Sequence, residues 1–393
     1  MKCRVLVVDD SVVVRRIVRE ALQGDPDIEV VGVAANGRIG LAMAEQLTPD
    51  AITLDFEMPE MDGLCMLRQL RGCGFSTPVI MFSTLTERGA LATLDALAAG
   101  ADDYVTKPSN VGNVLESIRR ISADLIPKIK ALCYRSCAPR LGESAGLRPA
   151  VRSSQPAAAD IPSAVVQPPL PKTARTAAPR SLEAARVDVV AVGTSTGGPN
   201  ALAEVIPRIP RDFPVPIVIV QHMPPTFTRF LAERLSAAAA IPLCEGRAGV
   251  ALEAGRGWIA PGDYHMAVHR EGTQVRLGVH QAPPENSCRP AVDVLFRSVA
   301  QVFGTHVLAV VMTGMGQDGL RGCEQIKEAS GQVIVQDEES SVVWGMPGFV
   351  AKAGLADRIL PLAQIADEII RRVSAGRRDS RNAVSIGAAV ASL

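Results

Sequence analysis

Neither sign of charge is in excess in this sequence, because 41 lysine and arginine residues balance 41 aspartate and glutamate residues. A protein that binds nucleic acid usually presents a basic face, so the balance argues against nucleic acid as a partner. Long hydrophobic runs are also lacking. No stretch approaches the ~18 apolar residues that a membrane helix needs, and the run Val5–Val8 is too short for the core of a signal peptide. We therefore expect a soluble, cytoplasmic protein with no direct membrane insertion.

The eight cysteines have no metal-binding or redox spacing. No C-x-x-C pair occurs, and no Cys/His cluster has the spacing of a zinc site. We expect reduced, buried thiols of the kind that cytosolic proteins carry. Nothing in the sequence demands more than a monomer, which is the oligomeric state that we predict.

What is present is an apolar chain of 393 residues, 47% of them hydrophobic, long enough for two domains of about 100–200 residues each. Residues 1–128 and 185–375 alternate short apolar runs with amphipathic segments, which predicts two α/β domains with doubly wound parallel sheets. Residues 129–184 are rich in alanine and proline, and we expect a flexible, disordered linker there. Residues 376–393 are polar and then small, and we expect a disordered tail.

Apolar runs predict the strands of both domains. A helix is expected over 11–23, where apolar residues recur at helical spacing. The longest β-branched runs lie in the second domain and are typical of central strands buried on both faces. The predicted strands are 5–8, 28–34, 51–54, 79–82, 103–106, 187–192, 217–220 and 307–312.

Acidic residues follow two strands of the first domain. Asp9 and Asp10 come after the first strand, and Asp55 comes after the third. Because the carboxyl ends of parallel strands meet at one edge of a sheet, these three carboxylates would repel each other unless a divalent cation lay among them. Hard oxygen ligands suit Mg²⁺. Ser83 and Lys107, at the ends of the next two strands, supply the hydroxyl and ammonium groups that a phosphoryl group would need.

With these residues, the first domain resembles the receiver domain of bacterial response regulators over about residues 2–125. The resemblance rests on V-D-D at 8–10, L-D-F-E-M-P-E-M-D-G at 54–63, Ser83, and T-K-P at 106–108. It implies a flavodoxin-like fold with phosphorylation at Asp55. It also implies a pocket formed by Asp9, Asp10, Ser83, Tyr104 and Lys107, and a Mg²⁺ site formed by Asp10, Asp55 and the backbone carbonyl of Glu57.

A glycine-rich turn follows an apolar strand of the second domain. The residues G-T-S-T-G at 193–197 match a pattern in which a sharp strand-to-helix turn exposes a serine hydroxyl, here that of Ser195. Such a serine needs a base, and the base needs an orienting acid. His222 and Asp318 each follow a predicted strand, so both fall at the same sheet edge. His265 is a competing base, ranked second because no strongly apolar strand precedes it.

The second domain resembles the chemotaxis protein-glutamate methylesterases over about residues 187–370. The motifs are V-G-T-S-T-G-G at 192–198, Q-H-M-P-P at 221–225, I-A-P-G-D at 259–263, R-P-A-V-D-V-L-F at 289–296, T-G-M-G-Q-D-G at 313–319 and W-G-M-P at 344–347. The resemblance implies a larger, Rossmann-like hydrolytic domain. In it Ser195 would be the nucleophile, His222 the general base and Asp318 the orienting acid, with the backbone N–H of Met315 as an oxyanion donor.

The same resemblance implies a phosphorylation-activated serine carboxylesterase. It would hydrolyse glutamyl methyl esters, and deamidate specific glutamines, on the cytoplasmic helices of chemoreceptors, which gives adaptation in chemotaxis signalling. Its partners would be the methyl-accepting receptors and a chemotaxis histidine kinase as phosphodonor. Mg²⁺ would serve the phosphorylation of the receiver, and the esterase step would need no cofactor.

Two other interpretations stay open on the residues alone. The second domain could belong to a response regulator that only binds a partner, and reaction of Ser195 with an acylating probe would decide against that. It could also bind a nucleotide through the turn at 193–198. That turn has neither the G-x-G-x-x-G spacing nor the G-K-[ST] ending of phosphate-binding loops.

Overall fold

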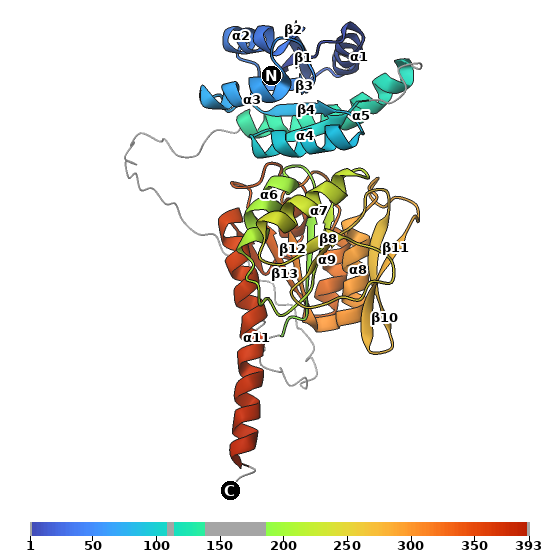
Figure 1. Ribbon diagram of the computed structural model, residues 1–393, viewed down its shortest axis with the longest axis vertical. Coiled ribbons are helices and arrows are strands. Elements are labelled where there is room, and N and C mark those ends of the chain that lie inside the picture. The colour runs from blue at the N-terminus through green and yellow to red at the C-terminus, as the bar shows by residue number, and fades with distance from the viewer. Residues whose placement is uncertain (1, 108–113, 138–185, 391–393) are drawn as a thin grey trace, which may run out of the picture.

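The computed structural model describes residues 2–107, 114–137 and 186–390. They form two α/β domains, and Figure 1 shows the first domain packed on one end of the second. The predicted linker lies outside the described residues from 138 to 184. Within the described ranges, no helix is both long and apolar enough to cross a membrane.

The first domain contains a five-stranded sheet in the order β2-β1-β3-β4-β5, with every strand pair parallel. Helices α1 and α5 pack on one face, and α2, α3 and α4 pack on the other, so the sheet is doubly wound as predicted. The elements are β1 (Cys3–Val8), α1 (Val12–Gln23), β2 (Ile28–Ala34), α2 (Gly37–Leu47), β3 (Ala51–Asp55), α3 (Gly63–Gly72), β4 (Val79–Ser83), α4 (Glu87–Ala98), β5 (Asp103–Thr106) and α5 (Val114–Cys137).

Short polar side chains begin four of these helices. Ser11, Asn36, Asp62 and Thr86 each accept a hydrogen bond from the backbone N–H three residues later. Each cap satisfies an N–H group that the first helical turn leaves unpaired. The caps therefore fix where each helix starts relative to the strand end before it, which is where the predicted pocket lies.

The second domain contains a seven-stranded parallel sheet in the order β14-β13-β12-β6-β7-β9-β8. An antiparallel hairpin, β10–β11, lies beside it. The strands are β6 (Val189–Thr194), β7 (Ile217–Gln221), β8 (Leu243–Glu245), β9 (Gly257–Ile259), β10 (His265–Glu271), β11 (Gln274–His280), β12 (Val307–Val311), β13 (Gln332–Gln336) and β14 (Arg358–Leu360).

Helices cover both faces of this second sheet. Side chains of α6, α7 and α11 enter one hydrophobic cluster, and those of α8, α9 and α10 enter another. The central strands β6, β7 and β12 are buried at every residue, as their apolar sequences predict. The helices are α6 (Gly198–Val205), α7 (Phe227–Ala238), α8 (Val292–Phe303), α9 (Leu320–Glu328), α10 (Met346–Lys352) and α11 (Leu362–Val390), with 3₁₀ turns η2 (Ile206–Arg208) and η3 (Gly304–His306).

Two helices run past the predicted domain ends. Helix α5 continues to Cys137, beyond the expected boundary at 128, and α11 continues to Val390, through most of the expected disordered tail. Part of the reason for the second difference is Arg377, whose guanidinium donates hydrogen bonds to the carbonyl oxygen of Val187 at 2.7 Å and to the Asp188 carboxylate at 3.2 Å. These contacts tie the helix to residues next to β6.

Cys3 and Cys133 form a disulfide, so the expectation of reduced, buried thiols is wrong for this pair, and it is also wrong in part for the free thiols, because Cys65, Cys73 and Cys244 are exposed. Cys3 starts β1 and Cys133 lies near the end of α5, and their Cα atoms are 6.3 Å apart. That separation suits a disulfide. The pairing has no signature in the spacing of cysteines along the chain, because the fold brings together residues 130 positions apart.

The receiver-like domain contacts the second domain through α4 and β5. Helix α4 packs against α6 and α7 (Figure 1). The ring of Tyr104, on β5, stacks on that of Phe227, with centroids 5.1 Å apart and planes within 10°. Arg234 of α7 forms an ion pair with Asp95 of α4 at 2.8 Å. One hydrophobic cluster contains residues from both domains, so the interface combines apolar burial with charge pairing.

Candidate active site and receiver pocket

The acidic residues of the first domain converge at the carboxyl ends of β1 and β3. The ammonium group of Lys107 lies 2.7 Å from Asp55 Oδ2 and 3.2 Å from Asp9 Oδ2. The carboxylates of Asp9, Asp10 and Asp55 provide oxygen atoms within 4.8 Å of one another. The structure therefore brings four of the predicted pocket residues together.

Electrostatics in this pocket favour a bound cation. Burial raises the pKa of Asp55 to about 6, and the nearby charge of Asp9 adds to the effect, although Lys107 opposes it. Burial also raises the pKa of Asp9. In the described structure, Asp9 Oδ2 is buried, and the Lys107 ammonium lies 3.2 Å away without forming a well-oriented hydrogen bond with it. Lys107 alone thus leaves carboxylate lone pairs unsatisfied, and hard oxygen donors of this kind fit Mg²⁺.

Two other predicted receiver residues make contacts away from Asp55. Ser83 is buried, and its hydroxyl donates to the carbonyl oxygen of Gly89 at 3.1 Å and accepts from the Thr93 hydroxyl at 2.7 Å. The hydroxyl is therefore committed to helix α4. The Glu57 carboxylate is exposed and lies 3.6 Å from Arg88. Only its backbone carbonyl was predicted to bind the metal, so this side-chain contact does not conflict with that prediction.

Tyr104 belongs to the domain interface as well as to the receiver. The side chain is buried, and its ring packs against Phe227 on one side while Lys128 lies 5.3 Å from the ring centroid. The resemblance to receiver domains places Tyr104 in the receiver pocket, but the sequence gives no sign of its partner Phe227. The contact makes Tyr104 a direct physical link between the receiver and the second domain.

The predicted nucleophile, Ser195, follows β6 in a turn that is held by one internal hydrogen bond and by bonds to two neighbouring segments. The Ser195 N–H donates to Thr313 O at 3.1 Å, and the Ser195 carbonyl accepts from Gly198 N at 2.8 Å and from Gln221 Nε2 at 2.9 Å. The N–H groups of Ser195 and Gly198 are therefore already paired inside the protein and do not point at a phosphate. This disfavours the nucleotide-binding interpretation.

Two glycines allow the chain to approach this turn closely. A Cβ atom on Gly314 would lie 2.4 Å from Met346 Sδ and 2.9 Å from Ser195 Cβ. Gly197 has a φ of +76°, which favours glycine, and a Cβ atom there would lie 2.5 Å from Val342 Cβ. Both positions therefore require glycine, and they pack the loops after β12 and β13 against Ser195.

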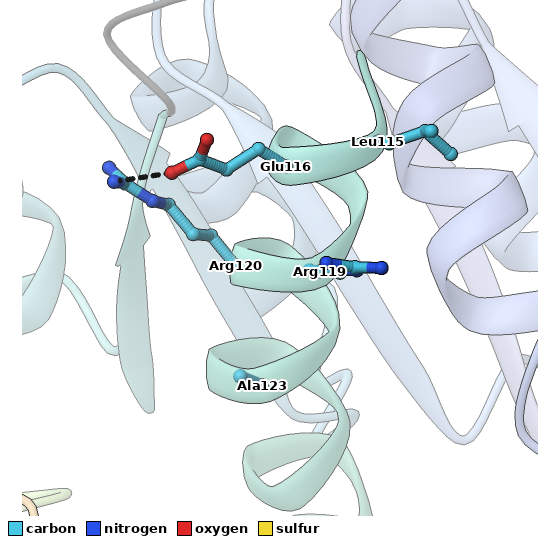
Figure 2. Close-up of a pocket in the computed structure, with 5 residues that line it drawn as sticks. All are labelled: Leu115, Glu116, Arg119, Arg120 and Ala123. Atoms are coloured by element: carbon cyan, nitrogen blue, oxygen red, sulfur yellow. Dashed lines mark hydrogen bonds and ion pairs between the residues drawn. The ribbon is translucent and has the colours of Figure 1, made fainter. Parts of the chain in front are cut away.

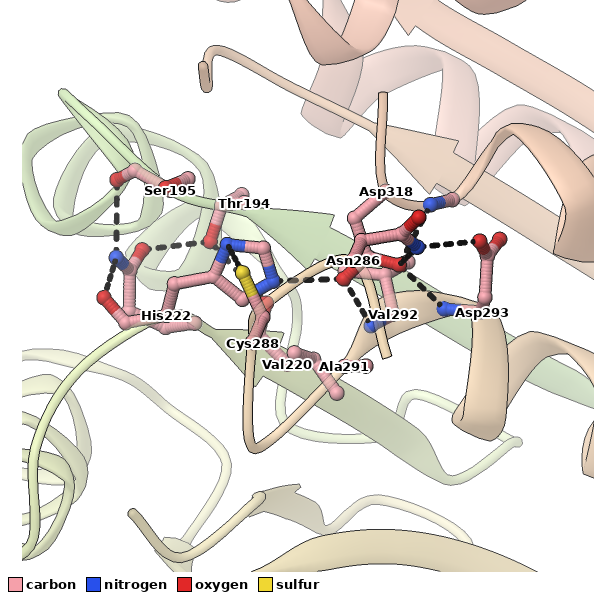
Figure 3. A network of polar contacts seen from close by, with 12 residues as sticks. Thr194, Ser195, Val220, His222, Asn286, Cys288, Ala291, Val292, Asp293 and Asp318 are labelled. Carbon is pink, nitrogen blue, oxygen red and sulfur yellow. Dashed lines mark hydrogen bonds and ion pairs between the residues drawn. The ribbon is translucent and has the colours of Figure 1, made fainter. Parts of the chain in front are cut away.

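His222 and Asp318 form a hydrogen-bonded pair beside the turn. His222 Nε2 lies 2.8 Å from Asp318 Oδ2 (Figure 3). Asp318 is buried and also accepts hydrogen bonds from the backbone N–H groups of Val292, Asp293 and Gly319, at 2.6, 3.0 and 3.0 Å. Val292 and Asp293 begin α8, so the amino end of that helix holds the carboxylate in place.

Sequence reasoning missed two side chains in the same network. Asn286 Nδ2 donates to Asp318 Oδ1 at 3.0 Å and to Asp293 Oδ2 at 2.8 Å, and Cys288 Sγ lies 3.6 Å from His222 Nδ1 (Figure 3). Both come from the loop before α8, directly ahead of the R-P-A-V-D-V-L-F motif. That motif identifies the region, but no spacing rule connects this loop to His222.

The hydrogen bonds determine the protonation of the pair. Burial alone would raise the pKa of Asp318, but the bonds from His222 and from backbone N–H groups hold it below its usual value. Burial lowers the pKa of His222, and contacts with Asp318 and Cys288 outweigh burial and raise it. Asp318 is therefore ionised and Nε2 carries a proton, so that when His222 is neutral, as a general base must be, its lone pair resides on Nδ1.

His265, the competing base, has a structural role instead. It is fully buried, and its Nε2 lies 3.1 Å from the carbonyl oxygen of Pro283. Its Nδ1 accepts a hydrogen bond from Ala291 N at 3.3 Å. Burial lowers the pKa of His265, which keeps the ring neutral. Both nitrogens thus anchor the loop that carries Asn286 and Cys288.

The predicted oxyanion donor, Met315, lies in the loop after β12 between two glycines. Among the described residues, no acceptor is hydrogen-bonded to its N–H group. The preceding residue, Gly314, packs against the Ser195 turn, because a Cβ atom added at Gly314 would lie only 2.9 Å from Ser195 Cβ. The Met315 N–H thus lies one residue after the glycine that packs against Ser195, and none of its hydrogen-bonding capacity is used by the described residues.

A surface hollow of about 510 Å³ lies elsewhere, along α5 (Figure 2). It is lined by Leu115, Glu116, Arg119, Arg120 and Ala123, and an ion pair joins Glu116 to Arg120 at 2.8 Å. All five residues come from one helix, and none belongs to either predicted site. The hollow adds nothing to the functional assignment.

Comparison with known proteins agrees with both domains. Residues 190–369 match the family model described as CheB methylesterase, and residues 5–119 match the response regulator receiver domain. A protein-glutamate methylesterase/protein-glutamine glutaminase of Trichodesmium erythraeum is 52% identical over 372 residues, covering 95% of this chain and 99% of the relative. The chain belongs to the CheB methylesterase family.

Other proteins of this family match all or part of the chain. A protein with the same name from Nocardioides is 49% identical over 375 residues, 95% of this chain and 96% of its own. The crystal structure of the Thermotoga maritima CheB methylesterase catalytic domain is 40% identical and covers 47% of this chain and 97% of its own, with a TM-score of 0.46. The predicted family, the α/β fold, the hydrolase class and the response-regulator architecture are confirmed.

Proposed function

We propose that this enzyme hydrolyses glutamyl methyl esters, and deamidates specific glutamines, on the cytoplasmic helices of chemoreceptors. Ser195 is the nucleophile, His222 the general base and Asp318 its orienting acid. The names of the full-length relatives support the substrate class. The observation that carries the residue assignment is the 2.8 Å bond between His222 and a multiply anchored Asp318, at the sheet edge where Ser195 follows β6.

The charge of Asp318 directs the chemistry to one nitrogen of His222. Since Nε2–H donates to Asp318, Nδ1 is the atom that takes the proton of Ser195 as the hydroxyl attacks the ester carbonyl. No hydrogen bond joins the Ser195 hydroxyl to His222 in the described structure. Such bonds often tighten only when substrate binds. In the proposed step, substrate brings the Ser195 oxygen within reach of Nδ1.

The remaining steps need no cofactor. The N–H of Met315 donates to the oxyanion, and losing one such donor typically costs about 10²–10³-fold in rate. His222 returns the proton to the leaving group, which departs as methanol from an ester or ammonia from a glutamine. Water then attacks the acyl-serine, with its proton going to Nδ1. Glutamate and free Ser195 are regenerated.

Control of this site is assigned to phosphorylation at Asp55 by a chemotaxis histidine kinase. Asp10, Asp55 and the backbone carbonyl of Glu57 would hold Mg²⁺, which supplies positive charge to the incoming phosphoryl group, and Lys107 would contact that group. Phosphorylation adds about −1.5 to −2 charges. Because Ser83 binds α4 and Tyr104 stacks on Phe227, rearrangement of these two residues would loosen the interface of the receiver with α6 and α7 and raise activity.

Methanol release from methyl-labelled chemoreceptor tests this proposal, with and without a small-molecule phosphodonor and Mg²⁺. We expect release that Ser195→Ala and His222→Ala abolish and that the phosphodonor raises only when Asp55 is present. His265→Asn is the matched histidine control and retains turnover per folded molecule. Release that survives Ser195→Ala would reject the nucleophile, and release that ignores phosphodonor in protein with an intact Asp55 would reject the control.

A further inference from the structure

Three side chains of the active site form a mixed set of metal-binding groups. His222, Cys288 and Asp318 each offer one donor atom, and the three atoms lie within 4.8 Å of one another. The receiver pocket offers only carboxylate oxygens, which suit a hard cation. Nitrogen and sulfur donors favour a softer ion such as Zn²⁺. The two clusters thus differ in the chemical class of ion that they would bind.

The distance between the donor atoms matches a bound zinc ion. Zinc binds imidazole nitrogen at about 2.0–2.1 Å and thiolate sulfur at about 2.3 Å in a tetrahedral arrangement, which places the two donors about 3.6 Å apart. His222 Nδ1 and Cys288 Sγ are 3.6 Å apart. The site is also reachable, because the side chain of His222 is 12% exposed and Cys288 is half-buried.

The second nitrogen of His222 is already oriented as a metal-binding histidine requires. Metal-bound histidines usually donate their other N–H to a carboxylate, which fixes the ring and its tautomer. Asp318 accepts this hydrogen bond from Nε2 at 2.8 Å and is itself held by Asn286 and by the start of α8. The ring therefore presents the lone pair of Nδ1 toward Cys288.

We propose that Zn²⁺ binds between His222 Nδ1 and Cys288 Sγ and inhibits the esterase reversibly. On binding, the Cys288 S–H bond breaks, its proton passes to solvent, and an S–Zn bond forms beside the N–Zn bond, with water completing the coordination. Inhibition follows because the ion occupies the lone pair that takes the Ser195 proton. This consequence rests on the proposed function, whereas metal binding itself does not.

Metal binding is measured first, on the full-length protein, with Co²⁺ as a spectroscopic substitute for Zn²⁺. We expect a thiolate-to-cobalt charge-transfer band, and its displacement by one equivalent of Zn²⁺. Cys288→Ala loses the band and binds Zn²⁺ at least about tenfold more weakly. Cys244→Ala, which removes an exposed thiol on β8, retains both. Equal bands in wild type and Cys288→Ala would overturn the site, whatever the enzyme hydrolyses.

Inhibition is then measured on methanol release, each variant being compared with its own metal-free rate. In the absence of phosphodonor, so that the Mg²⁺ site of the receiver plays no part, Zn²⁺ inhibits the wild type and the Cys244→Ala variant, a chelator restores their rates, and Mg²⁺ does not inhibit. The Zn²⁺ concentration for half-inhibition rises at least about tenfold in Cys288→Ala. Cys288→Ser, which preserves the volume of the side chain, serves if the alanine variant melts early. Equal inhibition of wild type and both variants rejects the proposal, while absent metal-free activity rejects only the proposed function.

Discussion

The hydroxyl of Thr196 donates a hydrogen bond to the carboxylate of Asp103 across the two domains, with 2.8 Å between Oγ1 and Oδ2. Both residues are buried, and Asp103 also forms an ion pair with Lys128 at 2.9 Å. Thr196 directly follows the predicted nucleophile, and its carbonyl accepts a hydrogen bond from Thr313 at 2.8 Å. The last receiver strand is therefore bonded to the turn that carries Ser195.

Removing this bond should release part of the receiver's control. A buried hydrogen bond to a charged group contributes about 1.5–3 kcal/mol, so Asp103→Ala should shift the docking equilibrium at least about tenfold. We expect methanol release without phosphodonor to rise toward the phosphorylated level. Glu87→Ala is the matched control, because its ion pair with Arg229 is exposed and such pairs contribute little. Unchanged basal release in Asp103→Ala would show that this contact does not restrain the enzyme.

Asn286 should support the orientation of Asp318 without taking part in proton transfer. Its amide donates to two carboxylates, those of Asp293 and Asp318. Asn286→Ala removes one hydrogen bond to Asp318, and we expect kcat for methanol release to fall about tenfold, the equivalent of roughly 1.4 kcal/mol. KM should stay within about twofold. Asn286→Asp should be worse, because it adds a third negative charge. A rise in KM with an unchanged kcat would place Asn286 in substrate binding instead.

The close approach of Gly314 to Ser195 leaves no room for a larger residue at position 314. An added Cβ at Gly314 would lie 2.4 Å from Met346 Sδ and 2.9 Å from Ser195 Cβ, so Gly314→Ala must displace the nucleophile, its neighbours or both. We expect kcat to fall at least about 10²-fold, since misplacement by about 1 Å can cost that much. Gly72→Ala, where a Cβ meets nothing within 4 Å, is the control. A Gly314→Ala protein with normal kcat would mean that the loop yields without moving Ser195.

Much of this arrangement could be predicted because it is encoded locally. Strongly apolar runs place the central strands, and a polar residue directly after a parallel strand must lie at the carboxyl edge of the sheet. Asp9, Ser195 and His222 follow strands in this way, and Asp55 is the last residue of β3. The caps and glycines at these ends are equally local. Such features need no knowledge of which distant segments meet.

The parts that escaped prediction depend on contacts between distant segments. Cys288 approaches His222 from a loop 66 residues away, and Phe227 meets Tyr104 from another domain. The separation of the two residues along the sequence does not indicate either contact. His265 shows the same dependence, because its contacts with Pro283 and Ala291, which give it a structural role, come from residues 18 and 26 positions away. Long-range partners decide the role of a polar residue, and the sequence alone leaves them open.

The last prediction concerns the pH dependence of stability through Glu368 on α11. Hydrogen bonds from Arg371 lower the pKa of Glu368 to about 2, against burial, and Arg372 adds to the effect. Arg372 is buried, and its Nε lies 2.7 Å from the Glu368 carboxylate. Because the folded pKa lies below the usual value of 4.5 for a glutamate, this carboxylate stabilises the fold above about pH 4.5. Its contribution is lost as pH falls toward 2.

Glu368→Gln should therefore lower the free energy of unfolding by about 1–3 kcal/mol near neutral pH, with a deficit that shrinks toward zero near pH 2. Fluorescence of the two tryptophans, Trp258 and Trp344, reports only on the second domain, because both lie there. Denaturant titrations across this pH range measure the difference directly. Glu324→Gln removes an exposed ion pair with Arg321 and should give a small, nearly constant difference. A Glu368→Gln deficit that stayed equally large at low pH would arise from lost packing rather than from the charge of Glu368.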